Sequence, residues 1–187
     1  MANNVSAAKP KTGGAVSVAP QGTTLPTDAT TALGSAFAQL GYISDSGLTN
    51  SNTINTETVK AWGGDEVLVT YNGREVSFQF ELIEATNLDV LKQIYGAANV
   101  SGTLAGGISI NAKSNIEMPE QVFAIDMILK DGALKRIVIP AGRLSDLGDI
   151  TYADNDAIGY EVTITAVPDA SGNTHYEYIK ATGATNG

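Results

Sequence analysis

The sequence IGYEVTIT, residues 158–165, carries the clearest secondary-structure signal in the chain and decides the fold class. Its positions alternate between Ile158, Tyr160, Val162 and Ile164 on one side and Gly159, Glu161, Thr163 and Thr165 on the other. Successive side chains of a strand point to opposite faces, so one face of this strand is apolar and the other polar. An antiparallel sheet with one buried and one solvated face produces this pattern. We therefore expect a mainly β protein.

The same alternation recurs upstream, at residues 75–83. Here Val76, Phe78, Phe80 and Leu82 take turns with Ser77, Gln79, Glu81 and Ile83. The dipeptide Asn72-Gly73 precedes this stretch, and because Asn-Gly favours a tight turn, we expect a hairpin there with residues 66–71 as its first strand. Asp131-Gly132 predicts another hairpin turn. Further strands are expected at residues 15–20, 42–44, 53–61, 107–112, 121–129, 134–139 and 175–180.

One helix is expected, over residues 87–95. Thr86 or Asn87 can cap its start, Asp89 lies in its first turn, and Gly96 follows its end, where glycine is favoured. The apolar stripe of this helix consists of Leu88, Leu91, Ile94 and Tyr95. Such a stripe closes a hydrophobic core.

The polar stretch at residues 25–65 has a different character. Asp45-Ser46-Gly47 and Gly63-Gly64-Asp65 are turn signals, and the span between them is rich in Thr and Asn. This composition predicts a long β-hairpin or an extended loop, which in a compact domain usually has a function. Leu33, Phe37 and Leu40 have helical spacing, but Gly34 interrupts them, so residues 28–40 form either a short helix or a loop.

Composition narrows the class of protein. A chain of 187 residues fits one domain with arms. The absence of cysteine excludes disulfides, thiolate catalysis and cysteine metal sites, and the net charge of −9 disfavours a nucleic-acid-gripping surface. No apolar run approaches the roughly 20 residues that span a bilayer, so we expect no membrane insertion.

The expected architecture is a single β-sandwich or partial barrel over residues 13–180, with one flanking α-helix. A long hairpin loop is expected at residues 46–65. Residues 1–12 are small and polar and are expected to form a flexible N-terminal arm, and residues 181–187 a flexible tail.

No catalytic, cofactor or metal site can be assembled from the sequence. His175 is the sole histidine, lies in an apparently exposed strand, and is interpreted as a surface residue. Asp154-Asn155-Asp156 lacks the EF-hand spacing, and residues 102–107 lack the Gly-Lys-Ser/Thr of a phosphate loop, so these are taken as a turn and a flexible link. Trp62 could stack on a ligand or anchor the loop in the core or a neighbouring subunit, and we favour anchoring. We expect no enzyme.

Several phrases together resemble the tail tube, or major tail, proteins of long-tailed, non-contractile bacteriophages. The phrases are LPTDATTAL at residues 25–33, LGYISDSGLT at 40–49, AWGGD at 61–65, LIE at 82–84 and LKQIYG at 91–96. Their order and spacing are similar to the family over about residues 13–165, most of all to versions from phages of Gram-positive hosts.

The resemblance implies a structural subunit of the virion tail, made in the host cytoplasm, that self-assembles without a cofactor. Six copies would form a ring, and rings would stack around the tape measure protein into a tube that conducts double-stranded DNA during ejection. Tail terminator and baseplate or distal tail proteins would be further partners. The loop at residues 46–65 would bridge adjacent rings, with the terminal arms. The stacking residues would be Gly47, Leu48, Thr49, Ile54, Thr56, Val59, Trp62, Gly63 and Gly64.

The acidic balance agrees with this implication, because a DNA conduit must not bind its cargo. Glu81, Asp126 and Glu161 lie on expected strands and are candidates for the lumen, although ordinary solvent-facing charge is the alternative. A carbohydrate- or surface-binding β-sandwich module is the competing function. It would need clustered aromatic residues, and the chain has 6% aromatics and one tryptophan.

Overall fold

The fold is known from a computed structural model that describes residues 4–182. It is built from β-strands and contains one α-helix in this part of the chain. The strands are β1 (Lys9–Pro10), β2 (Val16–Pro20), β3 (Ala38–Gln39), β4 (Ile43–Lys60), β5 (Glu66–Leu82), β6 (Val100–Thr103), β7 (Gly107–Ile110), β8 (Gln121–Ile128), β9 (Leu134–Leu147), β10 (Tyr160–Ala166) and β11 (Tyr176–Lys180). The helices are α1 (Leu88–Tyr95) and the 3₁₀ turns η1 (Ala97–Asn99) and η2 (Lys130–Gly132). The expectation of a mainly β fold is confirmed.

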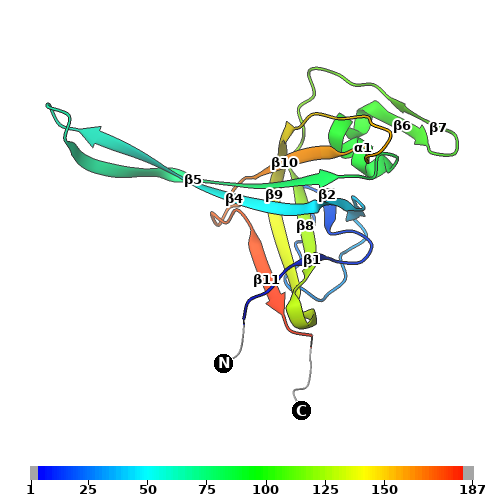
Figure 1. The fold of residues 1–187 in the computed structure, drawn as a ribbon, viewed down its shortest axis with the longest axis horizontal. Coiled ribbons are helices and arrows are strands. Elements are labelled where there is room, and N and C mark those ends of the chain that lie inside the picture. The colour runs from blue at the N-terminus through cyan, green and yellow to red at the C-terminus, as the bar shows by residue number, and fades with distance from the viewer. Residues whose placement is uncertain (1–3, 183–187) are drawn as a thin grey trace, which may run out of the picture.

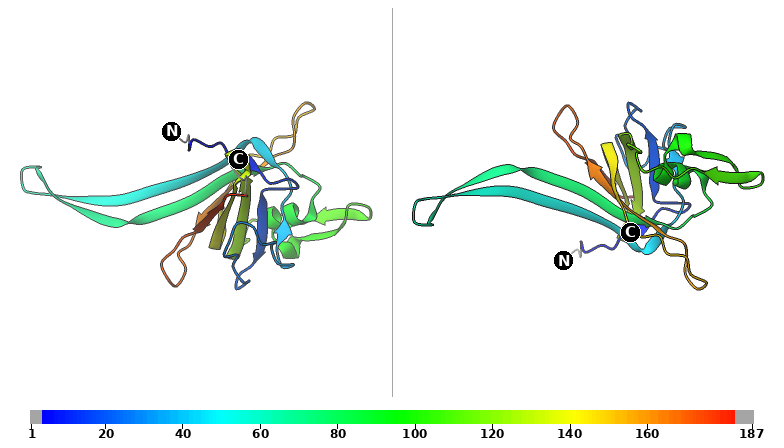
Figure 2. Two further views of the ribbon diagram at one scale, coloured as in Figure 1. Left: turned by 90° about the horizontal axis from the view of Figure 1, so that it is seen from below. Right: turned by 90° about the horizontal axis from the view of Figure 1, so that it is seen from above.

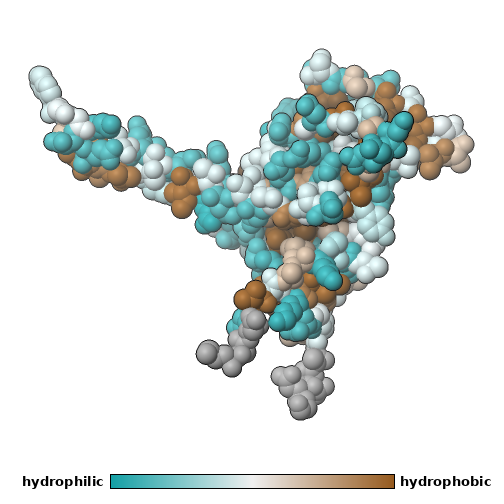
Figure 3. Space-filling view, viewed as in Figure 1, coloured by the Kyte–Doolittle hydropathy of each residue, from teal (hydrophilic) through white to brown (hydrophobic). Residues whose placement is uncertain are grey.

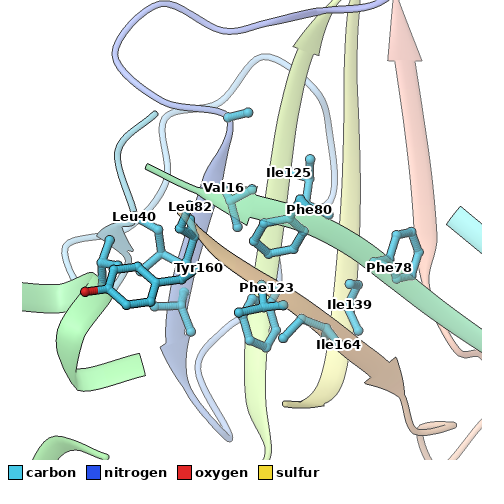
Figure 4. Packing of buried hydrophobic residues seen from close by; sticks show 14 of the residues in the cluster. Val16, Leu40, Phe78, Phe80, Leu82, Phe123, Ile125, Ile139, Tyr160 and Ile164 are labelled. Atoms are coloured by element: carbon cyan, nitrogen blue, oxygen red, sulfur yellow. The ribbon is translucent and has the colours of Figure 1, made fainter. Parts of the chain in front are cut away.

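One antiparallel sheet runs through the molecule in the order β3-β2-β8-β9-β10-β5-β4. β1 pairs with β8, and β11 pairs with β9 beside the first half of that long strand. The sheet folds over on itself, so that β10 and β5 cross in front of β8 and β9 (Figures 1 and 4). This arrangement gives the two layers of a sandwich from one continuous sheet.

The main core fills the space between these two layers, and α1 closes it. The alternation expected for β5 and β10 is realised, because their apolar positions are buried and the intervening positions are not. Figure 4 shows side chains from both layers meeting at this core. Its large members include Leu40, Phe78, Phe80, Leu82, Phe123, Ile125, Ile139, Tyr160 and Ile164.

A smaller apolar cluster lies on the opposite face of β2, β8 and β9. Ala19, Val122 and Val138 form it, and Leu25 and Phe37 pack on it from the loop between β2 and β3. The sheet is therefore covered on both faces here, which explains why the β8 burial pattern is nearly continuous.

The helix α1 begins and ends at the residues that the sequence signals. The Asn87 side chain accepts a hydrogen bond from the Asp89 backbone N–H at 3.0 Å, and Gly96 follows the helix with φ +84°. Val90, Leu91 and Ile94 are buried against the core. One further buried residue of α1, Gln93, is polar.

Two expected turns are β-bulges inside one long hairpin, and both predictions were wrong. Ile54 pairs with Arg74 and Thr56 with Tyr71, so Asn72 and Gly73 together face the single residue Asn55. Gly73 takes φ +110°, a backbone angle that is compatible with both an Asn-Gly turn and a bulge. The structure has a bulge there, because β5 stays paired with β4 on both sides of Asn72-Gly73. Likewise residues 44–47, expected as a turn, all face Glu81, and Gly47 has φ +76°.

Residues 28–40 are a loop ending in β3, so the helical alternative is wrong. The Asp28 carboxylate accepts from the Thr30 and Thr31 backbone N–H groups at 2.5 and 2.6 Å. These bonds, with those from the two threonine hydroxyls, hold the pKa of Asp28 well below its ordinary value. The apolar residues also separate, because Phe37 packs on the smaller cluster and Leu40 in the main core.

The glycine-rich residues 102–107 are also ordered differently from the expected flexible link. They form most of the tight hairpin β6–β7, which is a separate sheet. A Cβ atom on Gly102 would lie 2.0 Å from the carbonyl oxygen of Gly107, so close strand approach requires the glycine.

Residues 9–11, expected to belong to a flexible arm, are bonded to the main sheet. Lys9 and Pro10 pair with Ile128 and Met127, and the Lys11 N–H donates to the Asp126 carbonyl at 3.2 Å. The first three residues of the expected arm, and residues 183–187 of the expected tail, lie outside the described part of the chain.

Candidate functional site

The most prominent surface feature is the hairpin of β4 and β5, which projects far beyond the body of the molecule (Figures 1 and 2). Its projecting part, residues 54–74, is called the hairpin arm below. The strands pair as far as Lys60 and Glu66. At the tip the Ala61 N–H donates to the Asp65 carbonyl at 2.8 Å, and the Gly64 N–H to the Ala61 carbonyl at 3.0 Å. The turn predicted at Gly63-Gly64-Asp65 is thus present.

One face of the hairpin arm continues the core-facing side of the sheet. Directly paired residues share a face, and Phe78 and Val76 lie opposite Asn50 and Asn52 on the buried side. Further along β4 that face carries Ile54, Thr56 and Thr58. Thr56 and Thr58 pair with Tyr71 and Val69. Beyond the body nothing in the described chain covers this face, so apolar side chains that would be core residues elsewhere are exposed.

The hairpin arm carries exposed apolar side chains along its length. The exposed fraction of Trp62 is 107%, so its ring is fully accessible at the tip. Figure 3 shows hydrophobic residues on one side of the arm. The exposed apolar residues are Ile54, Val59, Trp62, Val67, Leu68, Val69 and Tyr71. Val59 and Leu68 pair on the face opposite Val69, so the exposed apolar side chains occupy both faces of the arm. Exposed apolar side chains gathered on one element mark an interaction site.

The candidate stacking residues all lie along this hairpin. Ile54, Thr56 and Val59 belong to the β4 side of the arm, and Trp62, Gly63 and Gly64 form its tip. Gly47 sits in the bulge at the base, while Leu48 packs partly on the core and pairs with Phe80. Thr49 pairs with Gln79 on the outer side.

Sequence reasoning missed the β5 side of the arm. Tyr71, Val69 and Leu68 were assigned to an ordinary paired strand, because Asn72-Gly73 was interpreted as its end. The signal was available, since Val67, Val69 and Tyr71 form an apolar face and alternate with Glu66, Leu68 and Thr70. The apolar face of such a strand requires a cover.

Glu81 and Glu161 lie together on the polar face of the sheet. They are direct partners in the β5–β10 ladder, and the Glu161 Oε1 atom accepts from Gln79 Nε2 at 2.5 Å. Thr163 pairs with Gln79, and Thr165 with Ser77, on the same face. The surface is therefore hydroxyl- and amide-rich, with two adjacent carboxylates. These side chains form the polar face of β5 and β10.

Asp126 is not a surface carboxylate, and its prediction as a lumen residue is corrected. Only 8% of the residue is exposed, because it lies under the loop between β2 and β3. Its two oxygens accept from Arg136 Nε at 2.6 Å and Arg136 Nη2 at 3.0 Å, and Lys11 Nζ lies 3.5 Å away. Its charge is neutralised inside the fold and is not presented to a lumen.

Arg136, which the sequence did not single out, joins three segments. Beyond its paired contacts with Asp126, Arg136 Nη1 donates to the carbonyl oxygens of Asp28 and Thr31 at 3.0 and 2.8 Å. The guanidinium thereby fastens the loop between β2 and β3 to the sheet. The planar fork of arginine fits this task, because it can serve a carboxylate and two carbonyls at once.

His175 is half-buried and not the surface residue that was expected. Its ring meets the ring of Phe78 edge to face, with centroids 5.3 Å apart. Burial lowers the pKa of His175, and Arg74 and Lys135 lower it further, against a raising effect of Glu177. The neutral imidazole is therefore favoured in the folded protein.

This shift predicts a pH-dependent stability. The folded pKa lies below the ordinary 6.5, so the unfolded chain binds the proton more readily. The stabilising contribution is complete above pH 6.5 and declines as the pH falls through the folded pKa. The midpoint of thermal unfolding should therefore fall more between about pH 7.5 and about pH 5.5 in the wild type than in His175→Gln. Equal declines in the two proteins would refute the role given to His175.

Other chemistry is sparse within residues 4–182. No group of three or more His, Cys, Asp or Glu side chains there could hold a metal ion. No helix in the same range is long and apolar enough to cross a membrane.

The chain was compared with known proteins and protein families. No curated protein matches the chain. A family described as phage tail tube protein matches residues 1–186, which is nearly the whole sequence. Its members are structural components of the virion tail. A β-sandwich with a long apolar hairpin and no catalytic constellation among the described residues is consistent with such a role. The chain therefore belongs to the phage tail tube protein family.

Proposed function

We propose that this tail tube subunit assembles into stacked rings, hexameric by its resemblance to long-tailed phage proteins, that form a conduit for DNA during ejection into the host. The observation that carries the proposal is the hairpin arm. Its exposed apolar face continues the core and has no cover within the described chain. A second copy would cover it, and in a tube every subunit has neighbours beside and beyond it.

The length and stiffness of the hairpin arm favour contact with a subunit of the next ring over contact with its own subunit. The arm leaves the body near the bulge at Asn72-Gly73 and extends well past it (Figure 2). Cross-strand links stiffen it, including Arg74 Nη2 to Asn52 Oδ1 at 2.7 Å and Asn72 Nδ2 to Glu57 Oε2 at 3.1 Å. A stiff arm loses little conformational entropy when it docks. The inter-ring role proposed for residues 46–65 thus extends to β5.

The polar face of β5 and β10 supports a lumen wall. Its carboxylates Glu81 and Glu161 repel phosphates. Arg143, which pairs with Thr165 on this face, lies within 3.8 Å of Glu117 and 3.5 Å of Glu120, which offset its charge. Like charges directly opposite each other disfavour the isolated sheet. Two carboxylates side by side suit a surface whose task is to let DNA slide. We propose that this face lines the channel, with the tape measure protein occupying it before ejection.

Electron microscopy of the purified protein at high concentration tests the proposal. We expect rings or tubes, alone or after addition of the other tail proteins, namely the tape measure, the terminator and the distal tail proteins. A map of the tube should place Glu81 and Glu161 on the channel wall. A protein that remains monomeric under all these conditions would contradict the proposal, and a surface-binding module would then be the better interpretation.

A further inference from the structure

We propose that the α1 groove, a hollow beside helix α1, receives the Trp62 tip of the hairpin arm of another copy. The inference rests on the proposed self-assembly and specifies where one subunit holds the next. The groove lies between α1, the strands β2 and β3, and the segment before β8. It measures about 290 Å³. Pockets for small molecules begin near ~300 Å³, so the groove has room for one large side chain and not for a long segment.

The walls and floor of the α1 groove suit an aromatic ring. Small apolar residues, including Ala19, Ala38 and Ala97, form much of its wall. Gln93 also lines it, and only 4% of that residue is exposed. The Gln93 Nε2 atom is buried without a hydrogen-bond partner among the described residues. An unpaired buried amide is unfavourable, so the position requires a reason outside the isolated chain.

The tip of the hairpin arm offers hydrogen-bond acceptors for the unpaired Gln93 Nε2 atom. Hydrogen bonds within the tip use the carbonyl oxygens of Ala61 and Asp65. Among the described residues none donates to the carbonyl oxygens of Trp62 and Gly63, which flank the exposed ring. Because Gln93 lines the groove, its amide offers unsatisfied N–H donors to a tip that docks there. A docked tip could then accept a hydrogen bond there while its indole fills the hollow.

The charges on the two surfaces are complementary. Lys60 and Glu66 are paired across the last rung before the tip. The rim of the α1 groove carries Asp89 and Lys92, half-exposed and 3.6 Å apart on successive turns. The tip can therefore place Lys60 near Asp89 and Glu66 near Lys92. The existing exposed pair costs little to open, because such pairs contribute little to stability.

The positions of tip and groove determine the kind of assembly. The end of the hairpin and helix α1, which lines the groove, lie on opposite sides of the body along its longest axis (Figure 1). A tip therefore cannot reach its own groove, and contact between two copies is head-to-tail. Heterologous contacts of this type repeat from copy to copy, which generates closed rings or open stacks.

Cross-linking tests the contact directly, because the chain has no cysteine of its own. Ala61→Cys is mixed with Ala97→Cys, which places one thiol at the tip and one in the groove wall. A short bis-maleimide reagent should join the two proteins into dimers during assembly. The matched control pairs Ala61→Cys with Ala153→Cys, an exposed site outside the groove. Cross-linking no greater than this control would overturn the proposal.

Two substitutions test the chemistry, with the critical concentration for assembly as the readout. Trp62→Ala should raise it about 30-fold or more, as truncation of a central tryptophan does at interfaces. Gln93→Met should raise it roughly threefold to tenfold, yet raise the thermal midpoint of the free subunit, because the unpaired amide is gone. A purely structural glutamine predicts the opposite thermal effect. Leu104→Ala, a matched exposed apolar truncation, should leave assembly unchanged.

The outcomes separate this inference from the proposed function. If Trp62→Ala and Gln93→Met assemble normally while removal of the hairpin arm abolishes tubes, the α1 groove is not the receiver and the tube function stands. Another hollow, such as that between β1 and the base bulge at Gly47, would then hold the tip. If the wild type forms no rings or tubes, the proposed function itself fails.

Discussion

Replacing Asp126 by asparagine is expected to lower the free energy of unfolding by about 3–5 kcal/mol. Arg136 is 1% exposed and is held by both oxygens of Asp126. The substitution would keep the volume of the side chain but leave a buried guanidinium without its counter-charge. Lys11, 3.5 Å from the same carboxylate, would lose its ion pair, but its half-exposed ammonium stays solvated and adds little to the loss. Urea denaturation monitored by circular dichroism gives the measurement.

A control on the same sheet distinguishes this effect from a general loss of charge. Asp146 on β9 is exposed, and Asp146→Asn should change stability by less than about 0.5 kcal/mol. The double variant Asp126→Leu/Arg136→Met should recover part of the loss, because no buried charge remains. It should still expose residues 25–37 to protease, because the Asp28 and Thr31 carbonyls lose their donor. A loss below about 1 kcal/mol for Asp126→Asn would contradict the assignment.

Removing the distal hairpin arm is expected to leave a folded subunit that cannot form tubes. Deletion of residues 56–71 joins Asn55 to Asn72, so that Ile54 and Arg74, already paired, are connected by Asn55-Asn72-Gly73. Three-residue hairpin loops commonly have glycine last, and Gly73 already takes a positive φ. The deleted residues contribute nothing to the main core. Assembly should therefore fall below detection by electron microscopy, with the thermal midpoint nearly unchanged.

A second variant keeps the hairpin arm and all of its charged residues and changes only its apolar surface. Val69→Thr/Tyr71→Thr retains β propensity at both positions while removing much of the exposed apolar area on that face. It should weaken assembly without abolishing the folded arm. Tubes of normal length and yield from the deletion variant would refute the role of the arm, whatever the outcome for the double substitution.

Alternation and capping made the body of the fold predictable. Strands such as β5 and β10 bury one face in the core and leave the other exposed. Their apolar and polar residues therefore alternate with period two, which the sequence shows directly. The helix was found because Asn87 and Gly96 act locally. The acidic face of β5 and β10 followed from the same alternation, as its two glutamates occupy the positions between buried residues.

The hairpin was harder to predict because local turn chemistry conflicted with long-range pairing. Asn72-Gly73 and Asp45-Ser46-Gly47 have the residues of turns, and only the register of β4 against β5 makes them bulges. The ion pair of Asp126 and Arg136 was missed for a related reason. Both lie on β8 and β9 positions that look solvent-facing until the loop between β2 and β3 covers them. Covering loops leave no periodic trace in a sequence.

The hairpin arm also has the properties of a molecular ruler. A strand advances about 3.3 Å per residue, so each pair of residues added to both strands would lengthen the arm by about 6.6 Å and restore the same side chains to the same faces. If the tip engages a neighbour, the number of paired residues between Ile54 and Lys60 helps set the spacing of successive copies along the tail. A change of one residue in either strand would instead disturb the register. Relatives with tubes of different axial repeat should therefore differ in arm length by even steps.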